Sequence, residues 1–168
     1  MSIVFKAMML LFLAFASPLA AAAQGAQIAF GGLKHDASLP VEISADQLTV
    51  DQADGSATFT GNVLIGQGEM RLSAGKVRVE YTSGAGDATG RVSRLVASGG
   101  VTLVNGAEAA EASEAVYTID TGMIVMSGSV ILTQGRNALS ADRLVVNLTN
   151  GTGTMDGRVK TILQTGGN

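Results

Sequence analysis

The chain has 168 residues, enough for one domain with a core of its own, and it contains 22 glycines, one histidine, no cysteine and no tryptophan. This composition offers few side chains for acid–base, nucleophilic or metal chemistry, and it excludes disulfides. The formal net charge is −3 at pH 7, and the basic residues are scattered, which argues against the dense basic surface that nucleic-acid binding requires.

The first 23 residues have the layout of a secretory signal peptide. A weakly basic start, MSIVFK, is followed by the apolar run AMMLLFLAFA and by the small residues SPLAAAA. The apolar run is shorter than the roughly 20 residues that a membrane-spanning helix needs. We therefore expect cleavage near Ala23 and export to the periplasm, and the alternative is a retained anchor helix. Residues 24–39 are then expected to form a flexible lead segment.

From Pro40 to residue 165, apolar and polar residues mostly alternate, and Gly, Asn, Asp and Ser interrupt the alternation at short intervals. Such a pattern is typical of short strands separated by turns. It predicts one all-β domain over 40–165 and a short tail at 166–168. One stretch is ambiguous, because Ala107–Ala115 consists of strong helix formers. Its second half leads directly into an alternating run, so that half is predicted to be strand.

Four short segments repeat the pattern Gly-X-Val: FTGNV, ASGGV, MSGSV and MDGRV. Their glycines, at positions 61, 99, 128 and 157, are 38, 29 and 29 residues apart. The first interval contains a glycine-rich insertion, Ser83–Arg91, which is predicted to be a surface loop. A repeat of this length indicates stacked β units, with about 12 to 16 short strands in an open jelly-roll or solenoid-like tube. The glycines are expected at strand corners, where they permit a sharp bend or a positive φ.

Residues 40–81, PVEISADQLTVDQADGSATFTGNVLIGQGEMRLSAGKVRVEY, carry the most specific likeness to a known family. Together with MSGSVILTQGRNALSADRLVVNL and GRVKTIL, they resemble the LptA/OstA family of periplasmic lipopolysaccharide transport proteins. The resemblance implies a slightly twisted, OstA-like jelly-roll of antiparallel strands that is open at both ends and carries lipopolysaccharide. It also implies head-to-tail joining, either with like-folded domains of an LptC-like inner-membrane protein and an LptD-like outer-membrane protein or between copies of the chain.

A lipid carrier has to keep acyl chains away from water, because each buried methylene group gains about 0.8 kcal/mol. We expect the inward residues of the strands to line an apolar groove for the acyl chains of lipid A, although the same residues could instead fill a core. The resemblance favours Val41 on the entry strand and the inward pair Tyr117 and Ile119. The candidate groove residues are Val41, Ile43, Leu48, Val50, Phe59, Val63, Ile65, Val77, Val79, Val101, Leu103, Tyr117, Ile119, Val130 and Leu144. Further inward positions are expected at Leu72, Met123, Val125, Leu132 and Val146.

Other chemistry has little support in the sequence. His35 is the one imidazole, and without cysteines or clustered carboxylates a metal site is not expected. The aspartates recur near turns, where they can accept hydrogen bonds from backbone N–H groups. Lys34, Arg158 and Lys160 lie near the expected mouths of the tube, where they meet lipid A phosphates or partner termini or are simply solvated. No catalytic residue, cofactor or metal is predicted.

The sequence therefore predicts a non-enzymatic lipopolysaccharide carrier that bridges components of the two membranes edge to edge. Two alternatives keep a similar fold. One is a ligand-free β-solenoid with a structural or envelope-adhesion role. The other is the periplasmic domain of an LptC-like inner-membrane protein, which would retain an N-terminal membrane helix. A glycan-active β-helix enzyme would need carboxylates clustered on one strand face.

Overall fold

The computed structural model describes residues 26–29, 36, 38–82 and 90–163. All the regular secondary structure in this part of the chain consists of β-strands, and every strand pairing is antiparallel. The strands are β1 (Ala26–Ala29), β2 (Glu42–Ser44), β3 (Gln47–Val50), β4 (Ala57–Gln67), β5 (Met70–Tyr81), β6 (Val92–Asn105), β7 (Glu108–Thr118), β8 (Met123–Gln134), β9 (Asn137–Asn147), β10 (Thr152–Asp156) and β11 (Lys160–Ile162). The prediction of an all-β fold of antiparallel strands is confirmed.

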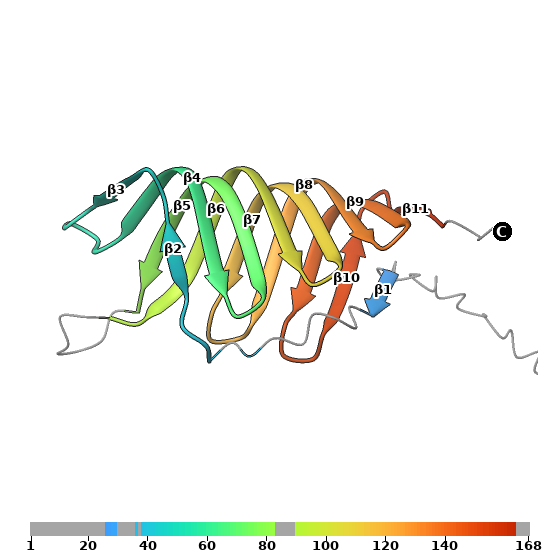
Figure 1. Cartoon of the computed structure of the whole chain (residues 1–168), viewed down its shortest axis with the longest axis horizontal. Coiled ribbons are helices and arrows are strands. Elements are labelled where there is room, and N and C mark those ends of the chain that lie inside the picture. Colours follow the sequence, from blue (N-terminus) through green and yellow to red (C-terminus); the bar gives the residue numbers. More distant parts are fainter. Residues whose placement is uncertain (1–25, 30–35, 37, 83–89, 164–168) are drawn as a thin grey trace, which may run out of the picture.

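The strands form one continuous sheet in which neighbours in the sequence are mostly neighbours in space (Figure 1). The order is β1-β10-β9-β8-β7-β6-β5-β4-β2, while β3 also pairs with β4 and β11 also pairs with β9. One end of the sheet, which we call the N-terminal end, is therefore formed by β2 and β3. The other, the C-terminal end, is formed by β10 and β11, with β1 added beside β10.

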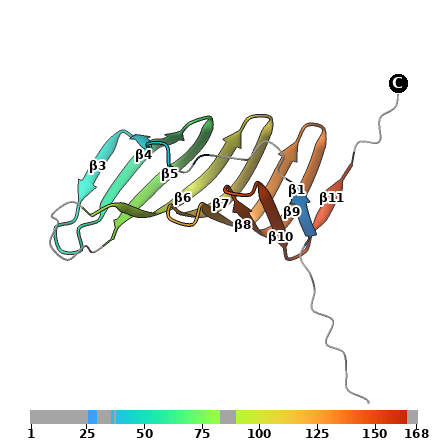
Figure 2. The same cartoon turned by 90° about the horizontal axis from the view of Figure 1, so that it is seen from below.

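The long strands bend near their middles, so the sheet folds over into two layers (Figure 2). The first layer contains β3 and β10, and the second layer contains β2 and β11. The bends lie at the four repeated glycines, whose φ angles are +80°, +81°, +84° and +76°. The residue after each glycine also has a positive φ; these residues are Asn62, Gly100, Ser129 and Arg158. The prediction that Gly-X-Val marks a strand corner is confirmed, and the X residue is part of the corner.

Close backbone approach at these corners also requires glycine. The facing pairs are Asp46–Gly61, Gly75–Gly99, Ser113–Gly128 and Asp142–Gly157. A Cβ atom added to Gly128 would lie 2.6 Å from Ser113 Oγ and 2.7 Å from Ser113 Cβ. In the first and last repeats the backbone N–H of the facing aspartate donates to the glycine carbonyl oxygen, at 3.0 and 2.9 Å. The small or acidic residue that precedes each glycine by about half a repeat, 15 residues in three cases and 24 where the insertion intervenes, is thus its packing partner.

A single apolar cluster fills the space between the two layers. Residues paired directly across antiparallel strands lie on the same face, so rows of inward residues follow from the register. In the first layer one row runs from Leu48 through Val77 to Met155. In the second layer a row runs from Ile43 to Leu139. Period-two alternation places these aliphatic side chains on one face, and the corners fold that face inward.

The segment 24–39 is not entirely the flexible lead that the sequence predicts. Ala26–Ala29 form β1, which pairs with β10 from Ala26 opposite Met155 to Ala29 opposite Thr152. Four residues without flanking alternation carry too little pattern to show as a strand. The sequence predicts that the domain starts at residue 40, but the sheet begins before that residue.

The helix-forming composition of Ala107–Ala115 is overridden, because β7 is paired on both sides, with β6 and β8. The strands are also longer than expected: six of the eleven described have 11 to 14 residues, and the long strands run through the corners. Residues 1–23, residues 83–89 of the predicted insertion and the tail at 166–168 lie outside the described residues. In the described ranges, no helix is long and apolar enough to cross a membrane.

Candidate functional site

Thirteen of the fifteen candidate groove residues lie between the two layers. Nine are buried: Val63, Ile65, Val77, Val79, Val101, Leu103, Tyr117, Val130 and Leu144. Four more, Val41, Ile43, Phe59 and Ile119, are half-buried and pack against the core. Of the further positions, Leu72, Leu132 and Val146 are buried, whereas Met123 and Val125 are only half-buried. Met123 pairs with Thr118 and Asn147, and Val125 pairs with Val116 and Val145. These partners lie one residue out of step with the inward rows, so the predictions of Met123 and Val125 as inward are both wrong.

The remaining two candidates, Leu48 and Val50, are 53% and 60% exposed. Both belong to inward rows by register, since Leu48 pairs with Phe59 and Val50 pairs with Ala57. They are exposed because β3 is the last strand of the first layer at the N-terminal end. The alternation identifies their face correctly, but burial also depends on a further strand beyond β3.

Side chains from the two layers fill the interior. The buried hydrophobic residues form a single cluster, against which the half-buried Val41, Ile43, Phe59 and Ile119 pack. A pocket bordered by Leu103, Leu132 and Val146 has a volume of about 10 Å³, which is room for one water molecule and not for an acyl chain. In this structure the interior is therefore a packed core and not the open groove that the sequence predicts. A lipid chain could enter only if the layers moved apart.

A polar row borders this core in the second layer. Gln67 and Asn105 are buried at its edge, at 1% and 3% exposure, and Gln134 occupies the equivalent place on β8. The hydroxyl of Tyr117, in the first layer, donates to Gln67 Oε1 at 2.8 Å, and this hydrogen bond joins the two layers. Gln67 Nε2 donates to the carbonyl oxygen of Leu39 at 2.8 Å, which ties the segment before β2 to the same place.

Glu108 is the acidic member of the polar row. Gln134 Nε2 donates to Glu108 Oε1 at 3.0 Å, while Glu108 Oε2 is buried and has no hydrogen-bond partner within the described residues. Burial raises the pKa of the Glu108 carboxyl, because the charged form loses hydration. The edge of the core thus carries polar groups that hydrogen-bond across and along the layers.

Sequence reasoning missed this row because the search for inward residues considered only apolar side chains. A signal was nevertheless present. Gln67, Asn105 and Gln134 each stand six residues after a corner glycine, at 61, 99 and 128. An inward position that carries an amide in three repeats indicates a shared structural or binding role.

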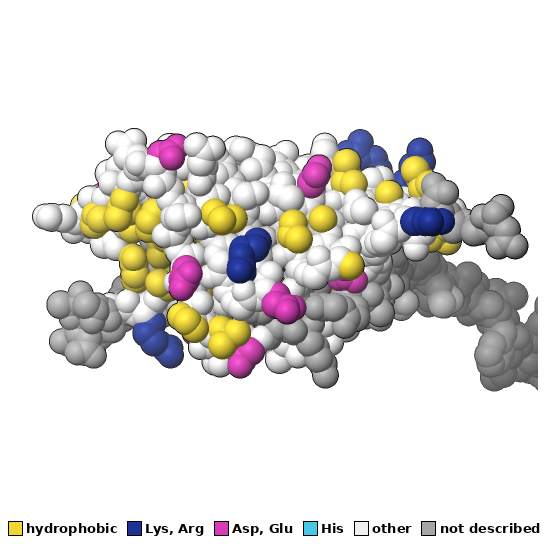
Figure 3. Space-filling model, in the orientation of Figure 1, with side chains coloured by type: hydrophobic (Ala, Val, Ile, Leu, Met, Phe, Trp, Pro, Cys, Tyr) yellow, Lys and Arg dark blue, Asp and Glu magenta, His cyan; other side chains and the backbone are white. Residues whose placement is uncertain are grey.

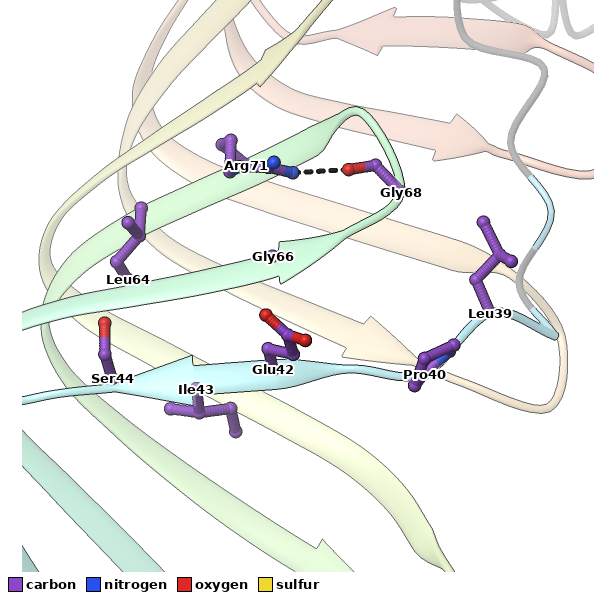
Figure 4. Close-up of a pocket in the computed structure, with 9 residues that line it drawn as sticks. All are labelled: Leu39, Pro40, Glu42, Ile43, Ser44, Leu64, Gly66, Gly68 and Arg71. Atoms are coloured by element: carbon purple, nitrogen blue, oxygen red, sulfur yellow. Dashed lines mark hydrogen bonds between the residues drawn. The ribbon is translucent and has the colours of Figure 1, made fainter.

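The N-terminal end carries a surface pocket of about 490 Å³ on the outer face of the sheet (Figure 4). It is lined by Leu39, Pro40, Glu42, Ile43, Ser44, Leu64, Gly66, Gly68 and Arg71. In Figure 4, Glu42 and Ser44 point to one side of β2 and Ile43 points to the other. Arg71 donates to the carbonyl oxygens of Gly68 and Met70. With a carboxylate and a guanidinium in its wall, this pocket is not suited to acyl chains.

Charges are dispersed over the surface, as one face shows in Figure 3. Arg158, predicted near a mouth of the tube, pairs with Asp142, and the hydrogen bond from Arg158 lowers the pKa of that carboxyl. Lys160 is exposed on β11, whereas Lys34 and His35 lie outside the described residues. Within the described ranges, no group of three or more His, Cys, Asp or Glu residues could hold a metal ion. Exposed ion pairs such as Arg158–Asp142 contribute little to stability.

Comparison with protein families matches residues 42–152 to the family described as LptA/(LptD N-terminal domain) LPS transport protein. The chain belongs to this family. The match includes β2 to β9 and reaches the first residue of β10, so it covers both layers and three of the four repeated corners.

Curated relatives match over shorter stretches. The uncharacterized protein R00383 of Rhizobium meliloti (strain 1021) is 32% identical over 109 residues, which are 63% of this chain and 59% of that protein. The lipopolysaccharide export system protein LptA of Escherichia coli (strain K12) is 39% identical over 49 residues, which are 29% of this chain and 26% of LptA. The matched stretch thus spans about three fifths of the first relative and about a quarter of the second.

Among solved structures, the fold is similar to that of LptH, the LptA-homologous periplasmic component of the lipopolysaccharide transport device of Pseudomonas aeruginosa. The TM-score is 0.65 at 16% identity, over 77% of this chain and 98% of LptH. At this identity the similarity shows the fold alone.

Proposed function

We propose that this protein is a periplasmic lipopolysaccharide carrier that shields the acyl chains of lipid A between the two layers of its sheet. The observation that carries the proposal is the set of inward aliphatic rows that continue from strand to strand through a folded-over sheet of the LptA family. A continuous apolar surface along the sheet suits a ligand with several long chains. No catalytic role is proposed.

The packed interior is compatible with carriage if the layers separate when lipid enters. An acyl chain of about a dozen methylene groups gains on the order of 10 kcal/mol when it leaves water. The inward side chains stay covered in both states, because acyl chains replace the contacts between the layers. The hydrogen bond from Tyr117 to Gln67 is one contact that has to break, and a hydrogen bond of this kind contributes about 1 kcal/mol net. The gain from the lipid therefore exceeds this cost.

Bridging between the membranes would use the two ends of the sheet. Leu48 and Val50 are exposed at the N-terminal end, and Val159 and Ile162 are 39% and 53% exposed at the C-terminal end. Strand edges with exposed aliphatic residues favour addition of a further strand. Like-folded domains of inner- and outer-membrane components would dock there and extend the apolar surface from one domain to the next.

The packed interior also favours a second candidate, a ligand-free structural protein of the envelope. The two differ in whether the layers open. Purified and delipidated protein should take up an apolar fluorescent dye and release it when lipopolysaccharide is added, if it is a carrier. A protein with a permanently closed interior should not bind the dye at all. Absence of dye uptake, together with absence of lipopolysaccharide binding by equilibrium dialysis, would contradict the carrier.

A further inference from the structure

The four repeats can be compared position by position, so the exposure of an inward residue in one repeat can be judged against its equivalents in the other three. The valine of Gly-X-Val is 1% exposed at Val63, 1% at Val101 and 0% at Val130. The fourth, Val159, is 39% exposed. Two residues further on, Thr161 is exposed as well, although its equivalents in the other repeats are buried. Within the described residues, no strand at the C-terminal end of the second layer covers Val159 and Thr161 as the equivalent residues are covered elsewhere.

The first layer at the same end is covered. Met155 stands two residues before the corner glycine and is 0% exposed, like its equivalent Met126. Among the described residues, the difference between the layers is β1, whose residues Ala26–Ala29 pair with β10 and not with β11. At the opposite end the first layer is the exposed one, since none of the described strands lies beyond Leu48 and Val50 of β3.

The strand β1 occupies the position that β3 of another domain would take. Strand directions alternate along the sheet, so a strand added after β10 has to run antiparallel to β10, as β1 does. An incoming β3 would have the same direction, because it is antiparallel to β4 and the alternation continues to β10. The strand register continues the inward row of Leu48 to Met155 on β10, and the inward row of Val50 to Gly153. Residues of β1 pair with these same two residues.

The strand β1 and the next strand in the sequence, β2, lie at opposite ends of the sheet. Strand β1 pairs with β10 at the C-terminal end, whereas β2 pairs with β4 at the N-terminal end (Figure 1). A four-residue strand with only one neighbour has four paired positions, fewer than the long strands, each of which is paired on both sides. Its release would leave the remaining sheet intact.

We propose that β1 is an intramolecular placeholder, which covers the first-layer half of the C-terminal end until β3 of a second copy of this chain replaces it. The exchange buries the exposed Leu48 and Val50 of the incoming copy, while its β2 covers Val159 and β11 in the second layer. This inference rests on the edge-to-edge joining proposed above, and it adds that joining is limited by release of the chain's own strand.

Two variants of the full chain, exported and purified without lipid, test the proposal in opposite directions. Gln27 and Thr154 are directly paired, and the chain has no cysteine, so Q27C/T154C can form a single disulfide that locks β1 onto β10. The double substitution Q27P/I28P removes two backbone N–H donors from β1 and releases it. Self-association is measured by sedimentation velocity over a concentration series, and the reduced form of Q27C/T154C is the matched control.

If β1 is released in about a tenth or less of the unmodified molecules, their apparent association constant is lowered about tenfold or more. We therefore expect Q27P/I28P to associate at least about tenfold more tightly than the unmodified chain. Oxidised Q27C/T154C should stay monomeric and regain association on reduction. In the released variant, Leu48→Asp should abolish the gain. Equal association of the locked and reduced forms, or a monomeric released variant, would overturn the proposal. Because the assay contains no lipid, a failure of lipopolysaccharide binding leaves its outcome unaffected.

Discussion

Replacement of Gly128 by alanine tests the corner geometry that folds the sheet over. Gly128 has φ = +84°, and an added Cβ would lie 2.6 Å from Ser113 Oγ and 2.7 Å from Ser113 Cβ. The left-handed backbone costs an alanine about 1–2 kcal/mol. The close contact forces displacement of a packed strand, which costs about a further 1–3 kcal/mol. We therefore expect Gly128→Ala to destabilise the protein by about 2–5 kcal/mol in total.

Gly106→Ala is the matched control, because Gly106 also has a positive φ of +58° but nothing lies within 4 Å of an added Cβ. It should cost only about 1–2 kcal/mol. Urea unfolding followed by far-ultraviolet circular dichroism gives both free energies. Adding Ser113→Gly to Gly128→Ala removes the two contacting atoms and should restore most of the difference in a double-mutant cycle. Equal losses for Gly128→Ala and Gly106→Ala would refute the role of close approach.

Three further predictions concern the core and its polar border. Tyr117→Phe removes the hydrogen bond between the layers and should destabilise the fold by about 1–3 kcal/mol in urea unfolding and increase uptake of an apolar dye, whereas Tyr81→Phe, at a 42% exposed residue, should change neither. Burial raises the pKa of Glu108 above its ordinary value of 4.5, so the neutral form favours folding below pH 4.5 and that contribution is lost as the pH rises through the folded-state pKa. Glu108→Gln should consequently be more stable than the unmodified protein at pH 7 but not below pH 4.5, and a constant difference at both pH values would contradict this. Met126→Ala, in the buried core, should cost about 2–5 kcal/mol in urea unfolding, while Ile131→Ala, 46% exposed, should cost less than about 1 kcal/mol.

The features that could be predicted from the sequence are those that each repeat encodes locally. Alternation identifies the inward face, because residues two apart share a side of a strand, and Val77 and Leu144 are buried as expected. The repeated Gly-X-Val identifies the corners, because a positive φ disfavours a Cβ and the close approach of a facing strand leaves no room for one. The strand assignment of the second half of Ala107–Ala115 follows from the alternation next to it, although composition alone favours helix.

The features that could not be predicted depend on what lies next to a residue in space. Leu48 has the same alternation as Val77, yet it is exposed because, among the described strands, none pairs with the outer edge of β3. The strand β1 gains its partner from the far end of the chain, and its four residues carry no periodic signal. The distance between the two layers decides whether the interior is a groove or a packed core. That distance is set by side-chain packing between the layers, and the alternation of apolar and polar residues does not encode it.

The central claim, that lipid occupies the space between the layers, is tested most directly by photo-crosslinking in growing cells. A photoreactive amino acid is placed at Leu132, which is 1% exposed and inward, and in a second strain at its neighbour Ile131, which is 46% exposed on the outer face of the same strand. The account predicts that lipopolysaccharide becomes attached at Leu132 and not at Ile131. Attachment at neither position, or at Ile131 alone, in protein that folds and accumulates normally would contradict it.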